Sequence, residues 1–300
     1  MRSLSKVWKQ LSEGIDPSLY LHSLGYSPYV WQDYALDPSA RRTIMLTARQ
    51  SGKSTYAAGK SSHIIKHEEN ALVVVIADSY KHSRETVKKV EEIVARDSTM
   101  PKTKIDNMYE KEYENGSRII ALPGSEKSVR GFSGPRLIIF DEAARIEDLT
   151  YKAARPMMAG TDCEVILTST SFGQRGFFYE RWNRPSPNWR KIMVLPRYKA
   201  VDNVLVENEP LEQLRARLVP QGIEPFYSER HSKDFLEEEL EELGEEWFNQ
   251  EYGCEFLQPV GGLFNYDQVL AMVTDKVNPL LLTGEAIESE MLGDLEVLTI

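Results

Sequence analysis

The sequence has little of what marks a secreted, membrane or metal-scaffold protein. Its 300 residues include two cysteines, Cys163 and Cys254. These are too few for a disulfide framework or a cysteine metal cluster, and we expect both to be reduced thiols. No apolar run approaches the roughly 18 to 20 residues that span a bilayer, and the charged start lacks the apolar segment of a signal peptide. These absences predict a cytoplasmic protein without membrane contact.

Positive charge is also scarce, because 36 Lys and Arg stand against 46 Asp and Glu, for a net charge of −10. This balance argues against a surface coated with nucleic-acid contacts, each of which needs a local cation. Residues 175–199 nevertheless interleave basic and aromatic side chains. They could follow a phosphate backbone, or form a strand-loop-strand rim whose aromatics lie in the core. In contrast, the spacing in 234–251 predicts an amphipathic helix with an acidic outer face.

Apolar runs alternate with helical segments over much of the chain. Continuous runs rich in β-branched residues suit parallel strands that are covered on both faces. The alternation predicts an α/β fold with a mostly parallel, doubly wound central sheet. Buried strands are predicted at 42–46, 71–77, 136–142 and 164–171, and helices at 54–69, 79–97 and from 147.

Two further segments depart from this alternation. The strand-like runs in 108–122 flank Asn115-Gly116, a strong hairpin signal, and predict an antiparallel addition to the sheet. Beyond residue 199 the pattern becomes helical, interrupted by Pro225 and other turn residues. We therefore predict a small helical lid subdomain over 200–260.

The most specific motif lies between the run 42–46 and the helix that follows. Residues 47–55 match the phosphate-binding pattern G-x-x-x-x-G-K followed by Ser or Thr, except that Thr47 replaces the first glycine. In this pattern backbone N–H groups wrap the phosphates, the lysine reaches the β and γ oxygens, and the hydroxyl holds Mg²⁺. The alternative is a solvated turn. The predicted nucleotide-binding residues are Thr47, Ala48, Gln50, Ser51, Gly52, Lys53, Ser54 and Thr55.

Two acids follow the apolar run 137–140. Asp141 is suited to hold Mg²⁺ together with Ser54, and Glu142 to orient and deprotonate an attacking water. Because transfer to a substrate hydroxyl has less need of the second carboxylate, Glu142 favours hydrolysis. The alternative, a strand end with two exposed acids, is disfavoured by the phosphate-binding loop upstream, since the roles of the residues converge.

Charge on a transferred phosphoryl group needs a further cation, usually an arginine. Arg49 lies inside the phosphate-binding loop and can reach its own nucleotide. Arg130 lies in the Gly-rich stretch 124–135 and can point at its own site or at a neighbouring subunit. Either arginine can instead be a solvent-exposed loop residue. Hydroxyls that can sense nucleotide state, or merely cap a strand, are Thr168, Ser169 and Thr170.

Together these motifs resemble the ATPase domain of the large terminase subunit of tailed bacteriophages, a motor that packages DNA into proheads. The resemblance covers nearly the whole chain and rests on 47–55, 137–144 and 168–170. It implies ATP and Mg²⁺ as cofactors and a P-loop NTPase fold. It also implies that the loop with Arg130 supplies a trans-acting finger within a ring of subunits on the prohead. The residues implied to contact adenine are Tyr29, Trp31 and Gln32.

The resemblance further implies double-stranded DNA, the portal protein and the small terminase subunit as partners, in the host cytoplasm. The predicted divisions are a P-loop ATPase core over 1–199, whose first 40 residues form a helical, adenine-binding segment, a lid and linker over 200–260, and a linker with a truncated start of a nuclease domain over 261–300. Endonuclease activity is therefore not expected. A helicase-like ATPase and a nucleotide-switched assembly adaptor are the alternative functions.

Overall fold

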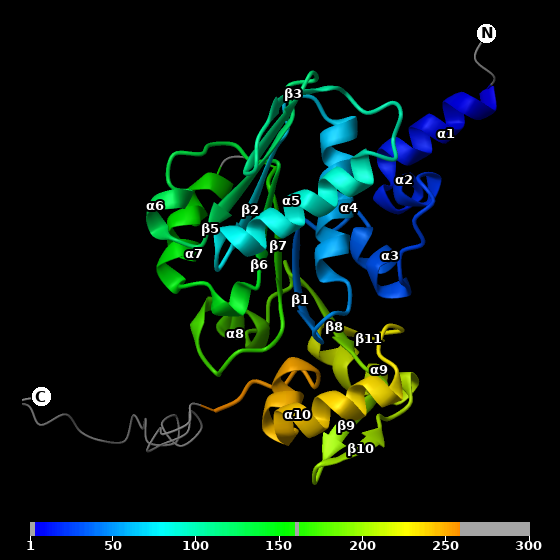
Figure 1. Ribbon diagram of the computed structural model, residues 1–300, viewed down its shortest axis with the longest axis vertical. Helices are drawn as coiled ribbons and strands as arrows, with labels where there is room; N and C mark the ends of the chain where they lie inside the picture. Colours follow the sequence, from blue (N-terminus) through cyan, green and yellow to red (C-terminus); the bar gives the residue numbers. More distant parts are fainter. Residues whose placement is uncertain (1–3, 160–161, 259–300) are drawn as a thin grey trace, which may run out of the picture. The chain divides into compact units, whose positions relative to one another are not determined.

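The predicted apolar strands lie within a nine-stranded sheet, whose order is β11-β8-β1-β7-β6-β2-β5-β4-β3 (Figure 1). This computed structural model describes residues 4–159 and 162–258. The strands from β11 to β5 run parallel, and β4 and β3 are antiparallel, so the mostly parallel α/β prediction is confirmed. The strands are β1 Arg42–Thr47, β2 Leu72–Ala77, β3 Thr103–Asp106, β4 Glu110–Tyr113, β5 Arg118–Pro123, β6 Leu137–Asp141, β7 Glu164–Ser169, β8 Arg190–Leu195 and β11 Ile223–Tyr227.

Alternate residues of the central strands supply two separate cores. On β2, Val74 and Ile76 pack into one core and Val73 and Val75 into the other. Helices α2–α5 cover the second face and α6–α9 the first, which is the doubly wound arrangement. The helices are α1 Leu4–Ile15, α2 Pro17–Ser23, α3 Val30–Leu36, α4 Lys53–His67, α5 Tyr80–Val94, α6 Glu126–Val129, α7 Asp148–Ala154, α8 Gly176–Asn183, α9 Leu211–Leu218 and α10 Lys233–Glu251.

The predicted hairpin is confirmed as β4 and β5, which pair antiparallel on either side of Asn115-Gly116. Gly116 has a φ of 80°, a conformation that glycine adopts without steric cost. No sequence pattern indicates β3, because all four of its side chains are exposed and it has no apolar alternation. Its neighbour β4 supplies the pairing that forms it.

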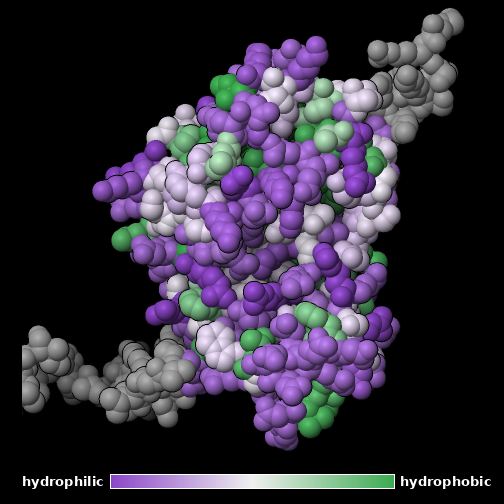
Figure 2. Space-filling view, viewed as in Figure 1, coloured by the Kyte–Doolittle hydropathy of each residue, from purple (hydrophilic) through white to green (hydrophobic). Residues whose placement is uncertain are grey.

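The helical pattern predicted beyond residue 199 is confirmed in α9 and α10, but it missed strands in two places. Strands β9 Tyr198–Val201 and β10 Val204–Glu207 form a separate hairpin, and β11 pairs with β8 at the edge of the main sheet. Pro225 lies within β11; an edge strand accepts proline because one side of its backbone is unpaired. The acidic helix is confirmed as α10, which packs its apolar residues against the hairpin, and its surface in Figure 2 is almost continuously hydrophilic.

The basic and aromatic stretch 175–199 forms α8 and β8, so its first element is a helix and not the strand of the strand-loop-strand alternative. The aromatic side chains Phe177, Phe178, Trp182 and Trp189 are all buried in the core that α8 shares with β6 and β7. Buried rings cannot stack on nucleic-acid bases, so the core alternative describes these four residues.

Several predictions fall on residues 261–300, where a linker and the start of a nuclease domain were expected. These residues lie outside the described part of the chain. Within the described part, no helix has both the length and the apolarity to cross a bilayer.

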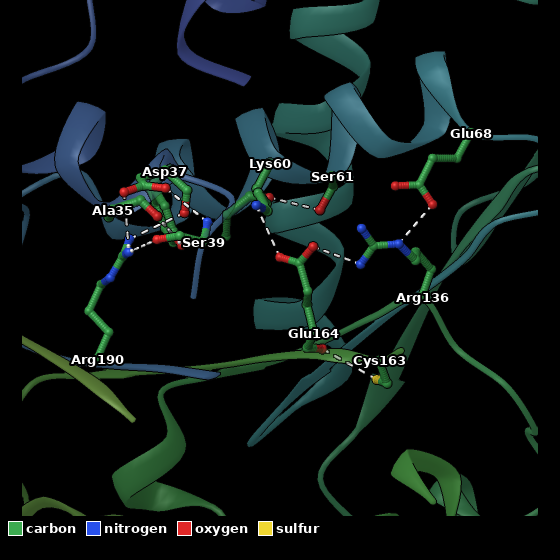
Figure 3. A network of polar contacts seen from close by, with 12 residues as sticks. Ala35, Asp37, Ser39, Lys60, Ser61, Glu68, Arg136, Cys163, Glu164 and Arg190 are labelled. Carbon is green, nitrogen blue, oxygen red and sulfur yellow. Dashed lines mark hydrogen bonds and ion pairs between the residues drawn. The ribbon is translucent and has the colours of Figure 1, made fainter. Parts of the chain in front are cut away.

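A buried ion network fixes α4 against the opposite end of the sheet from the predicted nucleotide site (Figure 3). Lys60 Nζ lies 3.0 Å from Glu164 Oε2, and these side chains are only 4% and 9% exposed. Arg136 pairs with two carboxylates. Its Nη1 lies 2.7 Å from Glu164 Oε1, and its Nε lies 2.8 Å from Glu68 Oε2. Glu164 therefore balances two cations, and Lys60 has Glu164 as its carboxylate partner.

We expect Glu164→Gln to destabilise the protein by about 3 to 5 kcal/mol, because it leaves the Lys60 ammonium buried without a counter-charge. Lys60→Met is the matched control, since Glu164 then keeps Arg136 as a partner, and its cost should be clearly smaller. Urea unfolding followed by circular dichroism measures both. Equal losses for the two variants would contradict this account of the network.

Candidate nucleotide-binding site

The predicted site residues meet at the carboxyl ends of three neighbouring parallel strands. The pairing register places Asp141 of β6 opposite Thr168 of β7, and Leu46 of β1 opposite Ser169. The phosphate-binding loop leaves the end of β1 and leads directly into α4. Ligands of open α/β sheets bind at such an edge, where helix N-termini also favour anions.

The loop from β1 to α4 is shaped by its backbone. Gly52 has a φ of 103°, and a Cβ at this position would lie 2.9 Å from Gln32 Nε2. Ser51 donates from Oγ to the Ala48 carbonyl at 2.7 Å, which closes the turn. Thr47, in the place of the usual glycine, is the last residue of β1 and pairs with Val194. Strand geometry needs no glycine there, so the threonine is accommodated without strain.

Lys53 and Glu142 form the central contact of the site. Lys53 Nζ lies 2.6 Å from Glu142 Oε1, with Lys53 only 10% exposed. Ser169 donates from Oγ to Glu142 Oε2 at 3.4 Å. Burial acts to raise the pKa of Glu142, but the charge and hydrogen bond of Lys53 outweigh it, and the pKa is lowered. Glu142 is thus held as an anion in contact with both the phosphate-binding loop, through Lys53, and the end of β7, through Ser169.

Glu142 also has an unusual backbone, with φ 52° and ψ 44°. This left-handed conformation is costly for a residue with a side chain and is concentrated at functional sites. Here it turns the chain sharply from β6 into the short 3₁₀ turn Ala143–Arg145. The turn directs the Glu142 carboxylate towards Lys53, while Asp141 remains within the strand.

Asp141 is buried and receives two hydrogen bonds, from Thr86 Oγ1 at 3.0 Å and from the Glu142 N–H at 3.1 Å. Burial, followed by the negative charge of Glu142, raises the pKa of Asp141. A cation beside this carboxylate would favour its charged form. In the described residues no three His, Cys, Asp or Glu side chains cluster as a metal site. The donors fit Mg²⁺, which keeps several waters and needs one or two carboxylates.

The predicted adenine-contacting residues divide into two groups. Gln32 donates from Nε2 to the Gly52 carbonyl at 2.9 Å, so α3 is tied directly to the phosphate-binding loop. Tyr29, Gln32 and Thr55 line a cavity of about 200 Å³. Trp31, in contrast, is 1% exposed, packs against Tyr56 and does not line this cavity. The structure therefore places Trp31 in the core, as support for the segment.

Sequence reasoning missed the contacts that join α10 to the phosphate-binding loop and to residues just beyond the two other strand-end motifs. The Arg49 N–H donates to the Glu251 carbonyl at 2.7 Å, and Arg145 Nη2 lies 2.8 Å from Glu251 Oε1. Ser171, just beyond β7, donates from Oγ to the Gln250 carbonyl at 2.6 Å. No motif could reveal these contacts, because most are made to the backbone across long stretches of sequence.

A residue that precedes α10, His231, contacts the carbonyl group of Arg49. His231 Nε2 lies 2.7 Å from the Arg49 carbonyl, and it must donate because a carbonyl only accepts. Burial lowers the pKa of His231, which keeps the ring neutral. The Arg49 backbone is thus held at its N–H and its carbonyl, while its side chain is exposed and forms no ion pair with the described residues. That side chain is free to turn towards a bound phosphate.

Arg130 is not brought to the other site residues. It follows α6, its side chain is 68% exposed, and it pairs with Glu126 of the same helix. The loop after β5 is separated from the loop after β1 by four strand spacings, about 19 Å in all. Among the described residues, no contact joins Arg130 to Lys53 or Glu142.

Residues 44–270 match the family described as terminase large subunit, T4likevirus-type, N-terminal, which is more than half of the chain. The chain belongs to the terminase large subunit family. No curated protein matches it. The large terminase ATPase domain of Thermus phage P74-26 has a similar fold, with a TM-score of 0.59 and 19% identity over 81% of this chain and 99% of that one.

Two longer terminases share the fold. The large terminase of bacteriophage HK97 has a TM-score of 0.55 and 15% identity, over 77% of this chain and 51% of that one. The large terminase of a second thermophilic bacteriophage, solved in complex with ADP, has a TM-score of 0.52 and 10% identity, over 83% of this chain and 53% of that one. This terminase chain therefore spans about half of each.

We expect Gly52→Ala to weaken nucleotide binding at least about tenfold, because it combines a positive φ with a collision against Gln32. Gly131→Ala is the matched control, since Gly131 has a φ of 102° but nothing within 4 Å of the added Cβ. Titration with a fluorescent ATP analogue measures the affinity. An equal loss of affinity in Gly131→Ala would contradict this account, because it would show a general effect on the fold and not a change in the phosphate-binding loop.

Proposed function

We propose that this terminase chain hydrolyses ATP to drive double-stranded DNA into a prohead. The observation that carries the proposal is the Lys53–Glu142 contact of 2.6 Å, which joins the phosphate-binding loop to a carboxylate suited to activate water. Family membership supports the reaction class. The ADP complex of a relative with the same fold supports an adenine nucleotide as ligand.

Each residue has a role that its position supports. Ser54 and Asp141 would hold Mg²⁺, which supplies positive charge beside the phosphates. The backbone N–H groups at the start of α4 bind the phosphate oxygens, and Lys53 neutralises them. Tyr29 and Gln32 border the cavity in which we place the adenine.

Nucleotide binding gives Lys53 a second anionic partner and so weakens its hold on Glu142. The freed carboxylate can then accept a proton from water as it attacks the γ-phosphate. Ser169 bonds to Glu142, and it accepts a hydrogen bond from the Ala144 N–H at 3.2 Å. We propose that the buried hydroxyls Thr168, Ser169 and Thr170 pass a change at Glu142 on to Ser171 and thence to α10.

Arg49 supplies a cation within its own site, and Arg130 supplies one to a neighbouring subunit. The distance between the loops after β5 and β1 supports action of Arg130 in trans, because it is far longer than an arginine side chain. Such an arrangement requires a ring of subunits, which we place on the prohead beside the portal protein and the small terminase subunit. A helicase-like activity would be distinguished by strand unwinding, and an adaptor by the absence of phosphate release.

We expect Lys53→Ala and Glu142→Gln each to lower ATP turnover by at least about a hundredfold, because each removes a group that acts in the transition state. Glu142→Gln should still bind ATP, since it keeps the shape and removes only the base. Phosphate release and nucleotide binding are measured on the same samples. Full turnover by Glu142→Gln would eliminate Glu142 as the base.

We expect the ATPase activity per molecule to rise with protein concentration, because the proposed finger acts only between subunits. Arg130→Ala should remove this rise, with a loss of about a thousandfold at saturation, and should leave nucleotide binding by the isolated chain unchanged. Lys104→Ala, on the exposed strand β3 and outside this loop, is the control. A flat concentration dependence together with an active Arg130→Ala variant would rule out the finger.

A further inference from the structure

A hollow of about 730 Å³ lies beside Arg130, between the loop after β5 and helix α7. Its lining is mainly apolar, and Leu149 within it is 58% exposed. Exposed apolar side chains of this size, gathered in one hollow, are typical of a protein-binding surface. The groove residues used below are Val129, Phe132, Leu149, Ala153, Pro156 and Met157.

Lysine and arginine side chains lie at the rim of this groove. Arg130 and Lys152 line it, and Lys127 and Arg155 flank it in the sequence. Lys127, Lys152 and Arg155 are exposed, and none of the three has a carboxylate partner in the described residues. In a protein of net charge −10, three unpaired cations around an apolar groove favour a partner that is both acidic and partly apolar.

Helix α10 has these two properties. Beyond the break at Gly244, where φ is 72° and ψ is 164°, Trp247 is 53% exposed. Glu241, Glu242 and Glu246 are exposed on the same helix and have no cation partner among the described residues. An exposed indole on a helix that also carries exposed carboxylates complements an apolar groove with a basic rim. Trp is also the residue type that most often dominates a protein interface.

The position of α10 fits a contact between two copies. Its last turn holds the phosphate-binding loop, through the bond from the Arg49 N–H to the Glu251 carbonyl. If Arg130 of one copy reaches the nucleotide of a second copy, as proposed above, the groove beside Arg130 in the first copy lies next to α10 of the second copy. Figure 1 shows α6 and α7 well away from α10 within one chain, so the two surfaces cannot meet intramolecularly.

We propose that α10 of one copy docks into the groove beside Arg130 of the next copy. Trp247 of α10 then lies in the groove, and the exposed glutamates of α10 lie against Lys152 and Arg155. Because the two surfaces are different, the contact is head-to-tail, and repetition produces a ring when the rotation closes. This interface deepens the proposed function, since it seats the trans arginine. It needs no ATP hydrolysis, so it can be tested separately.

Disulfide trapping between two populations of the full chain tests the interface. One population carries Ser133→Cys at the groove, and the other carries Glu238→Cys on α10; the native cysteines Cys163 and Cys254 are both buried. We expect the mixed dimer to form at least about tenfold faster than in a control in which Ser98→Cys replaces Glu238→Cys. Ser98 is exposed and lies beyond the end of α5. Equal rates would overturn the proposal.

Charge-reversal variants on the two surfaces give the decisive test, in which the rate of disulfide trapping is measured again. Lys152→Glu in the groove population should slow trapping about tenfold, and Glu246→Lys in the α10 population should restore most of the rate. Trp247→Ala should slow it without any change in salt dependence. If Lys152→Glu leaves trapping intact but weakens binding to duplex DNA, the rim is a DNA surface and the proposal is wrong. All arms are repeated with Lys53→Ala, so a failed ATPase assignment leaves this test unaffected.

Discussion

Parallel alignment of β1, β7 and β6 is the constraint on which the rest of this site depends. Parallel strands end at the same edge of the sheet, so three motifs that are far apart in the sequence become neighbours. The register then fixes which residues face each other, with Asp141 opposite Thr168. The 2.6 Å contact between Lys53 and Glu142 follows from this alignment and from the left-handed turn at Glu142.

The site is held mainly through the backbone of its phosphate-binding loop. Gln32 bonds to the Gly52 carbonyl, and the lid residues His231 and Glu251 hold the two ends of Arg49. Backbone contacts leave the Lys53 and Arg49 side chains available for phosphate. Glu251 joins this loop to the strand-end turn, since its carbonyl accepts from the Arg49 N–H and its carboxylate pairs with Arg145.

Residues that share a motif in the sequence have different surroundings in the fold. Tyr29 and Gln32 border a cavity, whereas Trp31, between them, supports the core. The aromatic residues of 175–199 lie in the core, because α8 turns them inward against β6 and β7. Sequence spacing alone cannot separate these cases, because the face that a side chain occupies depends on which element covers its neighbours.

The sequence by itself determined the four central strands β1, β2, β6 and β7, most of the helices, the Asn115-Gly116 hairpin, and the motif residues at Lys53, Asp141 and Glu142. Local apolar periodicity and turn chemistry encode these features directly. The tertiary structure alone decided that β11 accepts Pro225 at the sheet edge, that α10 holds the phosphate-binding loop, and that Arg130 lies four strands away from it. Each of these depends on contacts between distant segments, which no local pattern contains.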